Sequence, residues 1–149
     1  MTAEAVKPSS EPQRPLPEPS PESAAFWHAA RKHRLLLPCC NVCGKFWFPP
    51  SCICPHCVSD DVGWREAGGG GRVYSFVVFH RVYHQAFAKE VPYVVALIEL
   101  DEGPRLISNV VGVDPGSVRC GMRVRVTYHD VSPDVTLPKF AAEDELRIS

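Results

Sequence analysis

Six of the chain's seven cysteines lie close together, and four of them form two Cys-x-x-Cys pairs. The first pair is Cys40 and Cys43, and the second, after ten intervening residues, is Cys54 and Cys57. Each pair can form a tight turn that directs two thiolates at one ion, and two such turns complete a tetrahedron. Thiolate at all four positions leaves no place for water or substrate. The spacing therefore predicts a structural metal, with zinc favoured over iron.

The remaining cysteines and one histidine are weaker candidates as ligands. Cys39 and Cys52 break the two-residue spacing, and we predict that they are free thiols beside the site. His56 lies inside the second pair and would bind the ion only by displacing a cysteine. Cys120 is isolated and is expected to be a small core or turn residue. Clustered cysteines of this kind favour metal binding in a reducing compartment over disulfides.

A proline-rich segment begins the chain, and a helix is expected to follow it. Residues 1–20 contain five prolines with Ser and Glu between them and almost nothing apolar, which predicts a disordered tail. Ser20 or Ser23 can then cap a helix in which Phe26 and Trp27 follow at roughly helical spacing. These two aromatic side chains either pack within their own domain or face a partner.

Two short β signals flank the cysteine pairs, and four glycines follow. Residues 35–37 form an apolar run before the cysteines, and residues 62–64 provide a closing strand. Residues 68–71 are all glycine and have no side chain to restrain the backbone, which predicts a hinge. We therefore predict a helix and ribbon over residues 21–67 and a second domain over residues 68–149.

Beyond the glycines the pattern is all β. Four runs rich in β-branched or aromatic residues predict strands, and a fifth strand can follow them, at 73–79, 93–100, 105–111, 122–128 and 135–140. A long first strand and an irregular connection after the third fit an OB-type barrel. The predicted fold is mainly β, with an N-terminal helix, a rubredoxin-like zinc ribbon and a five-stranded OB-fold barrel.

The loop from His80 to Val91 carries the groups that come nearest to a catalytic set. It brings together imidazole and aromatic side chains from His80, Tyr83, His84 and Phe87. Such a loop can reach into a partner's active site, or it can be an exposed polar loop whose aromatics pack on the barrel. No nucleophile with a base and an orienting group can be assembled, so we predict that the chain is not an enzyme on its own.

Charge and hydropathy bear on the class of partner. The formal net charge is -1, and nine Lys and Arg against ten Asp and Glu follow Gly71. A barrel that binds single-stranded nucleic acid needs a basic groove, and the compact basic group here is only Arg123 and Arg125 with Arg119 nearby. A nucleic-acid-binding module therefore remains the alternative, beside a structural adaptor with no ligand.

The sequence contains no apolar run of about 18 residues, so no membrane-spanning segment is predicted. The charged, proline-rich start argues against a signal peptide. Both observations favour a location in the cytoplasm.

Several short motifs, taken in order, resemble one family. They are the two cysteine pairs, Phe48-Pro49-Pro50, Trp64, the glycines before Val73-Tyr74-Ser75, Pro92 to Leu97, Leu100 to Gly103, and Gly121 to Val124. Over roughly residues 23–140 the chain resembles the zinc-ribbon and OB-fold proteins, long called a domain of unknown function, that are encoded beside thiolases. One departure is Ser51, because the family often has an arginine there, so an anion contact by that residue is not expected.

The resemblance implies a function that the residues alone do not. It implies a non-catalytic accessory subunit of a thiolase-superfamily enzyme that makes or breaks C–C bonds in acyl-CoA substrates by thiolytic or aldol-type chemistry. The partner would be a thiolase-fold subunit, with a CoA thioester as a possible shared ligand. A small ribbon can hardly bury all its aromatics, so some should mark the interface. The candidate partner- or substrate-facing residues are Phe26, Trp27, Trp47, His80, Tyr83, His84 and Phe87.

Overall fold

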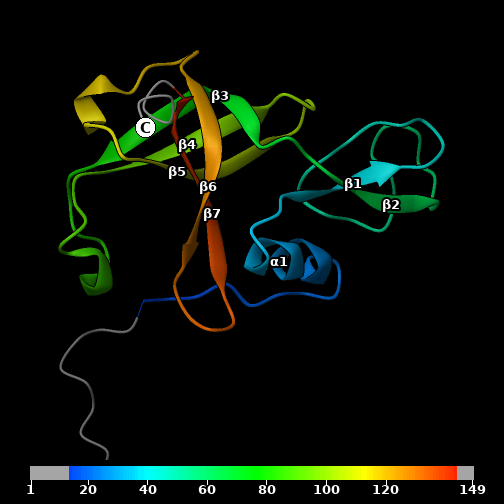
Figure 1. The fold of residues 1–149 in the computed structure, drawn as a ribbon, viewed down its shortest axis with the longest axis horizontal. Coiled ribbons are helices and arrows are strands. Elements are labelled where there is room, and N and C mark those ends of the chain that lie inside the picture. Colours follow the sequence, from blue (N-terminus) through cyan, green and yellow to red (C-terminus); the bar gives the residue numbers. More distant parts are fainter. Residues whose placement is uncertain (1–13, 144–149) are drawn as a thin grey trace, which may run out of the picture.

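The structure, a computed structural model, describes residues 14–143 and contains a short helix, a two-stranded ribbon and a five-stranded barrel (Figure 1). The barrel and the ribbon lie on opposite sides of the view in Figure 1, with the helix between them. Most of the predicted tail, residues 1–13, lies outside the described part of the chain, as do residues 144–149. The predicted fold class is confirmed.

Helix α1 spans Ala24–Arg31 and follows Ser23, its N-cap residue. The Ser23 hydroxyl does not bond to the helix but accepts the backbone N–H of Ser20 at 2.9 Å. After the helix, His33 adopts a left-handed φ of 57°, and its ring stacks on Tyr128 with centroids 5.0 Å apart. Its Nε2 lies 3.1 Å from an Asp130 carboxylate oxygen, so this residue connects the end of the helix to the barrel. No helix in the described residues has the length and apolar character needed to cross a membrane.

The ribbon consists of two antiparallel strands, β1 (Leu36–Cys40) and β2 (Val62–Glu66). Their register runs from Leu36 opposite Glu66 to Cys40 opposite Val62. Leu35 and Leu37 are 2 % and 0 % exposed and belong to the same apolar core as the barrel. The ribbon therefore shares a core with the barrel and is not packed by itself alone.

Five strands close into the barrel in the order β3-β4-β5-β7-β6. All neighbours are antiparallel except β5 and β7, which are parallel at Val110 opposite Phe140. This order and the single parallel pair give the OB-fold topology. The strands are β3 (Gly70–Phe79), β4 (Tyr93–Leu100), β5 (Arg105–Val111), β6 (Arg123–Asp130) and β7 (Thr136–Ala142), with short 3₁₀ helices η1 (Gln85–Phe87) and η2 (Pro115–Ser117).

Alternation along the strands produces the barrel core. In β4 every second residue is buried, from Val94 to Leu100, and Phe140 of β7 is 0 % exposed at the centre. The helix adds Phe26, which is 5 % exposed and lies against Phe48 of the ribbon with ring centroids 5.2 Å apart. A single apolar cluster thus joins helix, ribbon and barrel.

The glycine run has a packing role that the sequence analysis did not anticipate. Gly70 and Gly71 lie inside β3, where they close the barrel by pairing with Arg125 and Val124 of β6. A Cβ on Gly71 would lie 2.6 Å from the backbone oxygen of Glu99 in β4. Because real Cβ atoms do not approach a carbonyl oxygen so closely, the glycine permits the neighbouring strand to pair at this distance.

Candidate metal centre and partner-facing surface

The four predicted ligands converge at the tip of the ribbon. The Sγ atoms of Cys40, Cys43, Cys54 and Cys57 all lie within 4.8 Å of one another. The Cys40–Cys57 pair is 3.6 Å apart and the Cys43–Cys54 pair 3.7 Å. Four sulfur atoms placed about 2.3 Å from one zinc ion at tetrahedral angles are separated by about 3.8 Å. The donor set therefore fits a tetrahedral four-thiolate metal site, and the cysteines are positioned for a structural zinc.

Both cysteine pairs have the same backbone arrangement. Residue five of each turn donates its N–H to the carbonyl oxygen of residue one, from Gly44 to Cys40 at 3.0 Å and from Val58 to Cys54 at 2.9 Å. Further N–H groups point at sulfur, as from Val42 to Cys40 at 3.3 Å. These donors stabilise negative sulfur. The two turns differ at the fifth residue, where glycine and valine both adopt a left-handed φ, of 74° and 64°.

The thiol pKa values, shifted in opposite directions, are compatible with a site that holds a cation. The pKa of Cys40 is lowered to about 6, first by the backbone N–H of Cys43 and then by that of Val42, although burial opposes the shift. At Cys57 the Ser59 N–H lowers the pKa, but the hydrogen bond with Cys40 and burial raise it to about 12. Four adjacent thiols cannot all ionise without positive charge between them, and a divalent ion supplies that charge.

The weaker ligand candidates lie outside this cluster. Cys39 is buried, and its Sγ points to the backbone oxygen of Gly44 at 3.6 Å, whereas Cys52 is exposed. The His56 ring reaches the backbone oxygen of Phe46 at 3.3 Å. Within residues 14–143, the grouping of potential metal ligands contains neither these cysteines nor this histidine. The structure therefore brings together the four sulfur atoms that the paired spacing predicts as ligands.

Trp47 has a structural position beside the metal centre. It is 5 % exposed and packs with Cys40 and Cys54 in a small cluster of the ribbon. Its indole N–H donates to the Ser51 hydroxyl at 3.0 Å, which in turn donates to the Ile53 carbonyl at 2.8 Å. Little of Trp47 is therefore accessible to a partner, and a charged residue there would disturb the metal site itself.

The helix aromatics divide in the same way. Phe26 belongs to the core, whereas Trp27 is half-buried and meets Phe26 edge-on at 5.1 Å between ring centroids. The sequence left open whether Phe26 packs within its own domain or faces a partner, and the structure shows it packed within the chain. Trp27 keeps part of its surface accessible beside Pro19 and His28.

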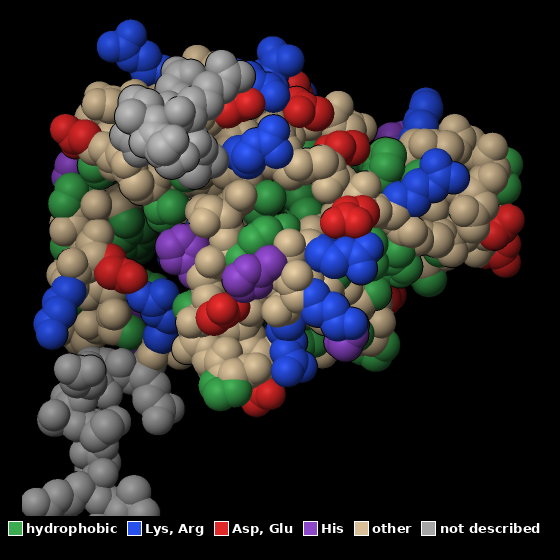
Figure 2. Space-filling model, viewed as in Figure 1, with side chains coloured by type: hydrophobic (Ala, Val, Ile, Leu, Met, Phe, Trp, Pro, Cys, Tyr) green, Lys and Arg blue, Asp and Glu red, His purple; other side chains and the backbone are tan. Residues whose placement is uncertain are grey.

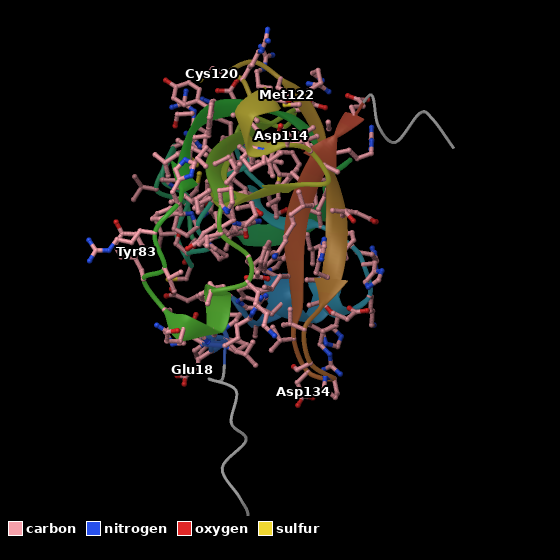
Figure 3. All side chains as sticks on the ribbon, turned by 90° about the vertical axis from the view of Figure 1, so that its left-hand side faces the viewer. Glu18, Tyr83, Asp114, Cys120, Met122 and Asp134 are labelled. Carbon is pink, nitrogen blue, oxygen red and sulfur yellow. The ribbon has the colours of Figure 1, made fainter. Side chains whose placement is uncertain are left out.

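The predicted loop joins β3 to β4 and is exposed over most of its length. His80 and His84 are exposed, and Tyr83 is 71 % exposed and projects away from the barrel (Figure 3). The His84 Nδ1 accepts the Ala86 N–H at 3.0 Å and caps η1, so this nitrogen is already engaged. Phe87 is partly buried, with its ring 5.8 Å from that of His84. The two imidazoles of the loop are not brought into a metal-binding group among the described residues.

An apolar surface that sequence reasoning missed lies on the outer side of β3, β4 and β5. Residues of β4 that point away from the core include Val95 and Leu97, which pair with Val77 of β3 and Ile107 of β5. Val77 and Ile107 are 55 % and 74 % exposed. We call this surface the outer apolar face; it comprises Tyr74, Val77, Phe79, Tyr93, Val95, Leu97 and Ile107.

A sequence signal for this face was present. A strand with one solvated side alternates apolar and polar residues, but β4 is apolar from Tyr93 to Ile98. Such a run is typical of a strand that is covered on both sides. The face also continues into the loop, because the ring of Phe79 stacks on Tyr93 at 5.2 Å and meets Tyr83 at 5.7 Å.

The basic residues of β6 are engaged in ion pairs. Arg123 donates to Asp101 at 2.8 Å and also lies 3.4 Å from Glu143. Arg125 donates to the Gly68 carbonyl at 3.1 Å and lies 3.8 Å from the same glutamate. These contacts neutralise the compact basic group on which a nucleic-acid interface would depend.

Two family domains match consecutive parts of the chain. The ChsH2 rubredoxin-like zinc ribbon domain matches residues 27–63, and the ChsH2 C-terminal OB-fold domain matches residues 64–129. A solved structure described as an Ltp2-ChsH2(DUF35) aldolase superimposes with a TM-score of 0.79 at 42% identity, covering 85% of this chain and 98% of that one.

Two curated relatives differ in length. A probable enoyl-CoA hydratase alpha subunit of Thermomonospora curvata is 43% identical over 127 residues, which is 85% of this chain but only 39% of that protein. A DUF35 domain-containing scaffold protein of Methanocaldococcus jannaschii is 34% identical over 72% of this chain and 76% of its own length. The two domain models match consecutive residues 27–63 and 64–129, and the scaffold relative is 34% identical over 72% of this chain, so the chain belongs to the DUF35 family of zinc-ribbon and OB-fold proteins.

Proposed function

We propose that this protein is a non-catalytic accessory subunit of a thiolase-superfamily enzyme that acts on acyl-CoA substrates. The ribbon carries a structural zinc, and the barrel binds a thiolase-fold subunit. Support for a subunit role comes from the aldolase and hydratase-subunit descriptions of its relatives. Support from the chain itself is the outer apolar face, which carries the proposal.

The outer apolar face has the properties of a protein interface. Its centre combines β-branched residues and leucine, and its margin has aromatic side chains, including Tyr74 beneath the Arg105 guanidinium at 3.8 Å. Contiguous exposed apolar surfaces mark interaction sites on soluble proteins, and aromatic and arginine side chains often dominate the binding energy. A partner that covers β4 would complete the burial that its sequence indicates.

The same surface gives the loop a place in the complex. Because Phe79 and Tyr83 connect the outer apolar face to the loop from His80 to Val91, a partner on that face also meets the loop. The exposed Tyr83, with Arg81 5.8 Å from its ring centroid, is then the side chain directed toward the acyl-CoA entrance of the partner. The protein thereby shapes the entrance without supplying a catalytic group.

Co-expression with thiolase-fold proteins from the same organism tests this proposal. The wild-type pair should elute as one heteromer in size exclusion at micromolar concentration. Ile107→Glu should weaken the complex at least about tenfold, because it places a charge in the centre of an apolar interface. Ile107 is 74 % exposed, so the variant should fold and retain its metal.

Val42→Glu is the matched control, because Val42 is 66 % exposed at the ribbon tip and lies outside the outer apolar face. This variant should bind the partner as the wild type does. Separate elution of the two wild-type proteins, with partner activity indifferent to this chain, would contradict the proposal. Thioester turnover by the pure chain, abolished by a change at His80 or His84, would contradict its non-catalytic part.

A further inference from the structure

A pocket of about 490 Å³ lies at one end of the barrel, apart from the metal centre and from the loop tip. Its walls come from the end of β5 and the residues after it, from β7, from η1 and from the segment that precedes α1. Figure 2 shows the surface hollowed on the left of the view, beside the segment that carries η1, with hydrophobic side chains in the hollow. The volume is in the range of small-molecule sites.

The pocket wall is mainly apolar. Its aromatic members are Phe87 and Tyr93, whose ring centroids are 6.1 Å apart. Val111, Val113 and Leu137 contribute aliphatic surface opposite them. Pro15 and Pro17, from the segment before α1, complete the wall. A ligand for this space needs a body of apolar groups.

The charged groups of the pocket are not balanced. Arg14 and Glu90 form an ion pair, and the Arg14 guanidinium also lies 4.9 Å from the centroid of the Phe87 ring. Lys139 is the third charged residue of the lining, and within residues 14–143 its ammonium group has no ion-pair or hydrogen-bond partner. One positive charge is therefore left over beside an apolar cavity.

The environment of Lys139 makes that charge costly. Partial burial lowers the pKa of its ammonium group, although Glu90 opposes the shift. A partly dehydrated ammonium group that has no carboxylate within ion-pair distance is stabilised by an anion placed next to it. The side-chain amide of Asn109, also in the lining, donates one of its two N–H groups to the Val94 carbonyl at 2.8 Å.

We propose that this pocket is a binding site for a small carboxylate with an apolar body. The carboxylate pairs with the Lys139 ammonium group, and the body lies between the aromatic wall of Phe87 and Tyr93 and the aliphatic wall of β5 and β7. Medium-chain fatty acids and aromatic carboxylic acids have this chemistry. The pocket adjoins the outer apolar face at Tyr93, which belongs to both. Its ligand chemistry is argued from its own lining, so the inference does not depend on the proposed partner.

Isothermal titration of the full chain with decanoate, decanol and decylamine tests the inference. These probes share the apolar body and differ only in the head group. Decanoate should bind at least about tenfold more tightly than either of the others. Equal affinity for decanoate and decanol, or no decanoate binding at about 1 mM, would overturn the proposal.

Two variants and one control locate the site. Lys139→Met keeps the apolar stem and should remove the preference for decanoate over decanol, whereas Val113→Trp should fill the cavity and abolish binding of both. Arg119→Met removes a positive charge from a different pocket and should change neither affinity. Wild-type decanoate binding by Lys139→Met would overturn the proposal even if the filled variant failed to fold.

A competition arm separates a free carboxylate from an acyl-CoA. Decanoyl-CoA carries the same chain, but a thioester replaces its carboxylate. It should displace decanoate weakly, because its acyl head is neutral. Displacement as strong as that by decanoate itself would overturn the carboxylate assignment and leave the proposed accessory role unaffected.

Discussion

The barrel and the ribbon are stabilised in different ways, although they touch. The barrel buries an alternating set of large side chains around Phe140, and its strands form a closed ring of hydrogen bonds. The ribbon has two short strands and a cluster of its own containing only Cys40, Trp47 and Cys54, with Val62 beside it. A module this small cannot bury enough apolar surface to fold by itself, so we expect metal binding by the four cysteines to supply the stability that a larger core would provide.

The barrel and the ribbon therefore depend on each other unequally. Leu35 and Leu37 extend from the ribbon into the barrel core, so losing the ribbon exposes part of that core. Among residues 14–143, no barrel residue belongs to the small cluster beside the cysteines, which is made of ribbon residues. We therefore expect unfolding of the ribbon to destabilise the barrel more than destabilisation of the barrel affects metal binding by the ribbon.

Loss of the metal should give the largest effect. Cys40→Ser removes one of four ligands, and structural zinc contributes about 10–16 kcal/mol to the folding of small modules. We expect metal content to fall from one ion per chain to nearly none, with the ribbon unfolded and the barrel retained but less stable. Elemental analysis and two-dimensional NMR measure both effects. Cys52→Ser, at an exposed cysteine outside the cluster, is the control and should be nearly silent.

Truncation of the barrel centre should come next. Phe140→Ala leaves a cavity at a fully buried position and should reduce the free energy of unfolding by about 3–5 kcal/mol. The folded variant should still hold its metal, which chemical denaturation combined with metal analysis would show. Ile107→Ala, at an exposed position of the same barrel, should change stability by no more than about 0.5 kcal/mol. Metal loss in the folded Phe140→Ala variant would contradict the expectation that the ribbon holds its metal independently of the barrel core.

Exchanging the fifth residues of the two cysteine turns should have a smaller effect. A left-handed φ costs a residue with a Cβ about 1–2 kcal/mol relative to glycine. Gly44→Val should therefore weaken metal retention, while Val58→Gly should strengthen it slightly, because added freedom in the unfolded chain offsets part of the gain. Competition with a chromogenic chelator measures both. The same direction of change in both variants would show that strain does not distinguish the turns.

The smallest expected effect is a pH dependence at the rim of the barrel. The hydrogen bond from Arg123 lowers the pKa of Asp101, against some desolvation. This pair contributes stability above the unfolded pKa of about 3.9, and the contribution is lost as pH falls through the lower folded value. Because the pair is half exposed, Asp101→Asn should cost less than about 1 kcal/mol at neutral pH and nothing at strongly acidic pH. Urea unfolding of wild type and variant at both pH values measures this, and an effect that grows on acidification would contradict it.

Much of the fold could be predicted from the sequence because its patterns are local. Paired cysteines specify their own geometry, and β-branched runs such as that of β3 identify strands regardless of their neighbours. The role of Gly71 could not be predicted, because it depends on the distance to Glu99 in another strand. The glycine run predicted a flexible backbone at Gly71, whereas the close packing of β4 against this residue is what requires glycine.

The outer apolar face was harder to predict than the cysteine cluster for the same reason. Aromatic side chains near the ribbon indicated an interface, but Phe26 and Trp47 are buried once the helix, ribbon and barrel pack together. The outer apolar face depends on the register that sets Leu97 beside Ile107, which no single strand contains. In the sequence, this face was indicated only by the continuous apolar run of β4, which lacks the usual alternation of apolar and polar residues.

The position of β7 in the barrel has a consequence for how the protein is made. Translation releases residues in order at about 5–20 per second, so the cysteine turns leave the ribosome well before Thr136–Ala142. The ribbon can therefore capture its ion early, while the sheet waits for its last strand to pair with both β6 and β5. During that interval Leu35 and Leu37 have no barrel to cover them. Nascent chains halted before residue 136 should thus hold metal and bind a holdase chaperone, and release should follow only when β7 emerges.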